Sequence, residues 1–111
     1  MATDPFALRD ADLRTWRGQF GDAAPIHELR PRHEATCVGV VHKIRLVPNR
    51  RLEVTVEDGS GRVTAVFTGR SNLPGLELGA GLRLSGTVAE DGDGGLVMRN
   101  PTWASVSEPY Q

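Results

Sequence analysis

The sequence has little of several residue types, and each shortage excludes a class of protein. Cys37 is its single cysteine, so no disulfide can form within the chain. No run of about 18 consecutive apolar residues occurs, which argues against a membrane-spanning helix. The first twenty residues lack the basic start and the apolar stretch of a signal peptide, so we expect a cytoplasmic protein that stays off the membrane.

Lysine is nearly absent as well. Lys43 is the only lysine among 13 basic residues, so the others are arginine, and 14 acidic residues bring the formal net charge to -1. Any phosphate contact would therefore be made mostly by guanidinium groups, which can donate two parallel hydrogen bonds. The near-neutral balance argues against a strong general nucleic-acid binder, because such proteins usually carry a large basic excess.

The N-terminal segment is predicted to be an amphipathic helix. Asp4 is a good N-cap and Pro5 suits the first helical position. Leu13, Trp16 and Phe20 then recur at helical spacing and form one apolar stripe. We expect this stripe to plug one end of a barrel, with a homodimer interface as the alternative.

From Ala35 onward the apolar period changes to two, which is typical of strands. Five strands are predicted, over residues 36–46, 52–57, 63–68, 82–88 and 96–106. Glycine-rich turns at 58–61 and 91–95 form hairpin loops, and Pro101 limits the last strand to an edge or a bulge. In the first strand the alternation assigns two faces: one with Val38, Val40, Ile44 and Leu46, the other with Cys37, Gly39, Val41, Lys43 and Arg45.

This order of strands predicts an all-β fold, a five-stranded Greek-key OB-fold barrel preceded by an N-terminal amphipathic α-helix. The connection at 70–79 contains Pro74 and Gly75, which disfavour a long helix there. An SH3-like barrel is the nearest competitor, whereas a β-sandwich needs about seven strands. We expect a helix and connector over 1–25, an OB-fold domain over 26–106 and a tail over 107–111.

Several stretches carry a family resemblance. They are Ile26–Pro31, Cys37–Val41, Leu52–Gly61, Val63–Gly69, Leu76–Gly79, Leu82–Val88 and Met98–Pro101. Together they resemble a bacterial OB-fold nucleic-acid-binding domain. The chain is similar to the wedge OB domain of RecG-type helicases, to anticodon-binding OB domains and to the small stand-alone OB-fold proteins of actinobacteria. The resemblance implies a nucleic-acid ligand, although aromatic rings that could stack on bases are not evident on the expected binding face.

A cluster of basic residues is the strongest functional signal. It comprises Arg30, Arg32, Lys43, Arg45, Arg50 and Arg51, opposed only by Glu34. In OB folds the first hairpin borders the ligand cleft, so this local excess can attract a phosphate backbone. Val41, Thr55, Thr64 and Val66 are predicted to form the floor. The opposite wall carries the acidic Glu90, Asp91 and Asp93, which would repel phosphate, and the alternative for the basic cluster is an ordinary solvated surface.

We therefore expect a non-catalytic module that binds single-stranded or partly opened nucleic acid mainly through backbone phosphates. The alternative is a protein-interaction module that uses the same face or the N-terminal helix. No cofactor and no metal are expected, because His33, Cys37 and His42 are too few for a structural zinc site. No arrangement of Ser, His and Asp with catalytic spacing stands out either.

Overall fold

The computed structural model describes residues 5–48 and 50–109, so the predicted cap Asp4 lies outside the described residues. Its elements are the helix α1 (Pro5–Arg17), a short 3-10 turn η1 (Ile26–Glu28), and the strands β1 (Glu34–Val47), β2 (Arg51–Glu57), β3 (Arg62–Thr68), β4 (Gly81–Glu90), β5 (Leu96–Arg99) and β6 (Thr102–Val106). Pro5 is the first residue of α1, as predicted.

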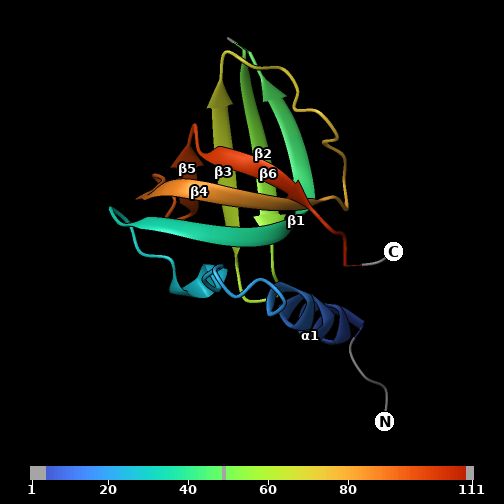
Figure 1. The fold of residues 1–111 in the computed structure, drawn as a ribbon. Helices are drawn as coiled ribbons and strands as arrows, with labels where there is room; N and C mark the ends of the chain where they lie inside the picture. The colour runs from blue at the N-terminus through green and yellow to red at the C-terminus, as the bar shows by residue number, and fades with distance from the viewer. Residues whose placement is uncertain (1–4, 49, 110–111) are drawn as a thin grey trace.

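Five strands close into a ring in the order β1-β2-β3-β5-β4, and β1 pairs with β4 to complete it (Figure 1). β3 and β5 run parallel, and the other pairs are antiparallel. β6 lies along the second edge of β4. The fifth strand predicted from sequence is thus two strands, because Asn100, with φ 49°, and Pro101 interrupt it.

β1 closes the ring because it is long enough to pair with two different strands. Its first half, Glu34–Val40, pairs with β4, and its second half, Val40–Val47, pairs with β2. Gly39 stands where the two halves meet. A Cβ atom there would lie 2.9 Å from Cβ of Val56, so only glycine allows β1 and β2 to approach this closely.

A β-bulge at His42 changes which side chains of β1 face the core. Val41 pairs with Val56 and Lys43 pairs with Thr55, so His42 is an extra residue without a partner. Cys37 and Val41 therefore point into the core, whereas Lys43 lies on the outer face. The prediction that these residues share one face was wrong, because strict alternation takes no account of an inserted residue.

The core fills the ring with apolar side chains from its five strands. Val54, Val56, Ala65, Leu84 and Met98 are all fully buried within it. The β3–β4 connection, residues 69–80, contains no helix, as predicted, and contributes the buried Leu73. No helix in the part of the chain that the structure describes is long and apolar enough to cross a membrane.

α1 does not plug the ring. Trp16 packs with Ala23 and Val38 in a second cluster, with Phe20 at its margin, and its Nε1 donates a 2.9 Å hydrogen bond to the carbonyl oxygen of Ser107. Val38 points away from the main core, so the helix covers the outer face of β1, and the predicted plug is wrong for Trp16 and Phe20. The connector enters the main core instead, through Ile26 and Leu29.

The buried carboxylate of Asp58 fixes the connector and α1 to the β2–β3 turn. It accepts hydrogen bonds from the backbone N–H of Ile26 at 3.0 Å and from the hydroxyl of Ser60 at 2.6 Å. Arg17 of α1 lies 3.4 Å from the same carboxylate, and Arg14 donates to the carbonyl oxygen of Gly59. A charge with this many partners can be buried without a large cost.

Replacing Trp16 with alanine should destabilise the protein, because the change removes the largest side chain that joins α1 to the ring. We expect the free energy of unfolding to fall by about 3 kcal/mol, measured by urea denaturation followed by circular dichroism. Asp12→Ala, at an exposed position of the same helix, should change it by less than about 0.5 kcal/mol. Equal stability of the two variants would show that α1 is not docked.

The thiol of Cys37 should be unreactive in the folded protein. Burial, together with the nearby Asp58 carboxylate, raises the pKa of Cys37 from 9.0 to about 12. Iodoacetamide at pH 8 should therefore modify it only at the rate of global opening, and urea should accelerate the reaction. Between pH 9 and 12 the thiol ionises in the unfolded chain but stays protonated in the folded protein, so ionisation stabilises the unfolded state. The free energy of unfolding should therefore decline over this range, and Cys37→Ala should lack that part of the decline. Modification as fast as that of a free thiol would contradict this.

Candidate functional site

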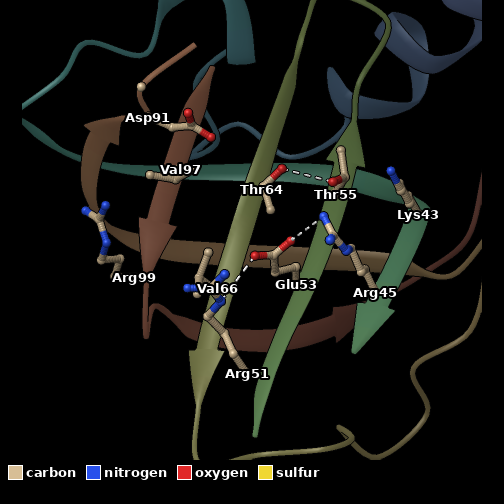
Figure 2. Close-up of a pocket in the computed structure, with 11 residues that line it drawn as sticks. Lys43, Arg45, Arg51, Glu53, Thr55, Thr64, Val66, Asp91, Val97 and Arg99 are labelled. Atoms are coloured by element: carbon tan, nitrogen blue, oxygen red, sulfur yellow. Dashed lines mark hydrogen bonds and ion pairs between the residues drawn. The ribbon is translucent and has the colours of Figure 1, made fainter. Parts of the chain in front are cut away.

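The outer face of β1, β2, β3 and β5 carries a groove of about 350 Å³ (Figure 2). Its walls and floor are formed by Lys43, Arg45, Arg51, Glu53, Thr55, Thr64, Val66, Asp91, Gly92, Val97 and Arg99. The groove therefore lies on the face where the sequence predicts a ligand. It draws on four neighbouring strands and on the loop between β4 and β5.

The strand register explains why these side chains meet. Side chains of directly opposed residues lie on the same face of a sheet. One row across the groove is Lys43, Thr55, Thr64 and Val97, and the next is Arg45, Glu53, Val66 and Arg99. The bulge at His42 brings Lys43 and Arg45 into these rows.

Four cations and two carboxylates line the groove, which gives it a local excess of positive charge. Glu53 lies between two arginines: its carboxylate is 3.3 Å from Nε of Arg51 and 4.0 Å from a terminal nitrogen of Arg45 (Figure 2). The side chains of Arg45 and Arg51 remain 64% and 47% exposed. These pairs contribute little to stability in water, but they hold two guanidinium groups over the sheet.

The floor consists of small side chains, of which Val97 is buried and the others are half-buried. The hydroxyls of Thr55 and Thr64 are joined by a 2.9 Å hydrogen bond, and Val66 and Val97 add two apolar side chains. None of the described residues that line the groove is aromatic. The floor can therefore support apolar contacts and hydroxyl hydrogen bonds, but it offers no ring for stacking.

The loop between β4 and β5 forms the opposite wall. The carboxylates of Asp91 and Asp93 accept hydrogen bonds from backbone N–H groups of the loop itself, at Asp93 and Gly95 respectively. The bond from Gly95 holds the pKa of Asp93 below its ordinary value. This loop is the predicted hairpin turn. Of Glu90, which ends β4, and the loop residues Asp91 and Asp93, only Asp91 lines the groove, so the wall is less negative than the sequence suggests.

The predicted basic cluster divides into two parts. Lys43, Arg45 and Arg51 line the groove with the predicted floor residues Thr55, Thr64 and Val66. Arg50 does not line it, because it lies in the turn between β1 and β2, where it has a positive φ of 62° and borders a hollow with Leu46 and Pro48. Arg30 and Arg32 precede β1, where the backbone N–H of Arg32 donates to the carbonyl oxygen of Val88, and they do not line the groove either.

Two charged groove residues, and the apolar Val97 beside them, were not singled out from the sequence. Arg99 stands two residues after Val97 in β5, so period-two alternation could have placed both on the outer face. It was not grouped with the basic cluster because it lies almost fifty residues after Arg51 in the sequence. Glu53 alternates with the apolar Leu52 and Val54, but its position between two arginines depends on the pairing of β1 with β2. Val41, predicted as part of the floor, belongs to the core instead.

Metal-ligating residues do not gather in the described part of the chain. Cys37 is buried in the core, whereas His42 lies at the bulge, 3.6 Å from the Glu57 carboxylate. The ring of His33 bonds to the carbonyl oxygen of Pro31. Within residues 5–48 and 50–109, no three His, Cys, Asp or Glu side chains lie close enough together to hold a metal ion.

No family model and no curated protein matches this sequence. Solved structures resemble it in fold. A replication protein A heterotrimer bound to ssDNA is 19% identical, with TM-score 0.55 over 68% of this chain and 58% of that chain. The p204 HINb domain is also 19% identical, with TM-score 0.64 over 83% of this chain and 51% of that one. A replication factor A related protein from Methanobacterium thermoautotrophicum is 20% identical, with TM-score 0.61 over 77% of this chain and 91% of that one.

These likenesses establish the fold. The closed five-stranded ring is an OB fold, as predicted from the sequence. The chain spans 58% and 51% of the first two of these solved chains, so it corresponds to only part of each. The narrower resemblance to RecG-type wedge domains and to small actinobacterial proteins stays a prediction.

Proposed function

We propose that the groove binds single-stranded or partly opened nucleic acid, mainly through backbone phosphates, and that the protein acts without catalysing a reaction. The observation that carries this proposal is the convergence of Lys43, Arg45, Arg51 and Arg99 on one groove from three different strands. Cations scattered over a surface attract polyanions weakly, whereas cations lining one groove can neutralise successive phosphates.

The exposed guanidinium groups are suited to this role. Arg45 and Arg51 each face Glu53, yet both stay largely accessible to solvent. An exposed ion pair is nearly neutral in energy, so exchanging the carboxylate for a phosphate costs little. Planar guanidinium groups can donate two hydrogen bonds to a phosphate, which favours a fixed path of the backbone along the groove.

The floor indicates what kind of binding to expect. With Thr55, Thr64, Val66 and Val97 as floor and no aromatic ring among the described lining residues, stacking contributes little. Affinity should then depend on counterion release, which makes it modest and sensitive to salt, with weak preference for base sequence.

The structural neighbours support a nucleic-acid ligand by analogy of fold. The replication protein A structure is bound to ssDNA, and the Ifi202 HINa domain, 16% identical with TM-score 0.60, is in complex with 20bp dsDNA. An OB fold can serve other ligands, so the groove and not the fold is the ground for this proposal.

A protein partner is the second candidate. The groove includes Glu53 and Asp91 among its cations, and a mixed-charge surface suits a protein as well as a polyanion. An OBody, 17% identical to this chain with TM-score 0.62, is bound to hen egg-white lysozyme. If proteins are the only ligands of this face, the unaltered protein should show no measurable affinity for an oligonucleotide.

The double variant Arg45→Ala with Arg51→Ala should lose binding to a fluorescein-labelled oligothymidylate in an anisotropy titration at low salt. We expect affinity to fall about tenfold to a hundredfold, since each lost charge-assisted contact costs about 1 kcal/mol. The slope of log affinity against log salt should also become shallower by about 1 to 2.

The matched control is Arg30→Ala with Arg32→Asn, which removes the same charge outside the groove. Asn tolerates the positive φ of 72° at position 32. This control should bind within about twofold of the unaltered protein. Equal losses in the two double variants would mean that only net charge matters, and the groove would not be the site.

Glu53→Gln should strengthen binding to the same oligonucleotide, because it removes the carboxylate that competes with phosphate for two arginines. We expect affinity to rise by about threefold to tenfold, while the melting temperature changes by no more than about 3 °C. Glu77→Gln removes the same negative charge at an exposed position of the β3–β4 connection, outside the groove, and should change the affinity less. Unchanged or weaker binding by Glu53→Gln would contradict the proposal.

A further inference from the structure

One edge of β1 is left without a strand partner. β4 pairs with β1 only as far as Val40, and the β3–β4 connection bonds to β1 only at Val41, through Gly79 and Ala80. In the part of the chain that the structure describes, residues from Lys43 to Val47 bond through their backbone to β2 alone. Alternate N–H and C=O groups of this segment therefore point away from the sheet, which is the pattern of an edge strand.

This free edge has an uncovered apolar face. Ile44 and Leu46 lie on the inner face of the β1–β2 hairpin beyond the closed ring, and they are 37% and 59% exposed. Leu46 also borders a hollow of about 370 Å³ with Val47, Pro48, Arg50 and Ser71 at the hairpin tip. Their pairing partners Val54 and Leu52 are buried, so the exposure is confined to the edge.

The other face of the same edge is basic. Lys43 and Arg45 project on the groove side, and the side chain of Arg45 is 64% exposed. An added strand would place its own side chains on both faces in alternation, because successive residues of a strand point in opposite directions. Its residues on the groove side would meet cations, and those on the inner side would meet Ile44 and Leu46.

We propose that the free edge of β1 from Lys43 to Val47 binds an extended peptide in which acidic and apolar residues alternate, and that the peptide adds a strand to the sheet. Backbone hydrogen bonds would supply affinity and the two faces would supply specificity, as in other strand additions. A second copy of this chain is a poorer occupant. Two-fold pairing of this edge would set Lys43 and Arg45 beside the same cations of the other copy.

The peptide and a nucleic acid would compete, because both engage Lys43 and Arg45. This consequence rests on the proposed function of the groove, whereas strand addition itself does not. An acidic segment of another protein could in this way displace a bound strand.

The experiment uses the full chain and three synthetic hexapeptides with blocked ends. The first alternates glutamate and valine, the second alternates lysine and valine, and the third is the first peptide N-methylated at every residue. We expect calorimetry to show at least about tenfold tighter binding of the glutamate peptide than of either other peptide. Amide hydrogen exchange of alternate residues between 43 and 47 should slow in the complex.

Leu46→Glu should weaken binding of the glutamate peptide by about tenfold or more, and because Leu46 is exposed the variant should fold normally. Gln19→Glu, which adds a charge on the segment after α1, is the control and should leave binding unchanged. Absence of binding at about 1 mM peptide, equal binding of the N-methylated peptide, or protection outside β1 would overturn the inference. A dimer in sedimentation that the peptide does not dissociate would overturn it as well.

The two proposals can fail separately. Peptide binding with no oligonucleotide binding would refute the groove function and leave strand addition standing. Oligonucleotide binding without any peptide binding would refute strand addition and leave the groove function standing. If both ligands bind, the glutamate peptide should raise the apparent dissociation constant of the oligonucleotide in proportion to its concentration, and simultaneous binding would refute the competition.

Discussion

The structure depends on one strand that pairs with two partners and contains one inserted residue. β1 closes the ring because its first half pairs with β4 and its second half with β2. The change of partner requires Gly39, where any side chain would collide with Val56. The bulge at His42 then reverses the facing of the residues that follow. Without that reversal, Lys43 and Arg45 would share a face with the buried Cys37 and Val41, and the groove would lose two of its cations.

The N-terminal segment stabilises this arrangement at the first half of β1 and at the β2–β3 turn. Trp16 covers the outer face of β1 near Val38, and Asp58 ties the connector and α1 to the β2–β3 turn. The α1 arginines are directed to carboxylates and carbonyl oxygens there, as with Arg9 at Glu57, so they are not available to the groove. A chain with nearly balanced charge can thereby keep a local positive excess on one face.

The strands and their turns could be predicted from period-two patterning and turn residues, because these signals are local. The order of the strands and the longer connection before β4 then favoured a closed barrel. Convergence of Lys43, Arg45 and Arg51 with Thr55 and Thr64 also followed from alternation on adjacent strands. The bulge could not be foreseen, because an inserted residue has no signature in the alternation of Val40, Val41 and His42. Arg99 and the position of Glu53 required the register between strands, which depends on tertiary contacts. The docking of Trp16 outside the ring depends on the same long-range packing.

On the proposed function, a strand of nucleic acid lies on the outer face of β1, β2, β3 and β5. The most direct test is NMR of the isotope-labelled protein during titration with an unlabelled oligothymidylate. We expect progressive amide shift changes in the two rows of the groove, centred on Lys43, Thr55, Thr64 and Val97, with the segment 26–33 unaffected. Shift changes confined to α1 or to the segment around Arg30 would contradict it.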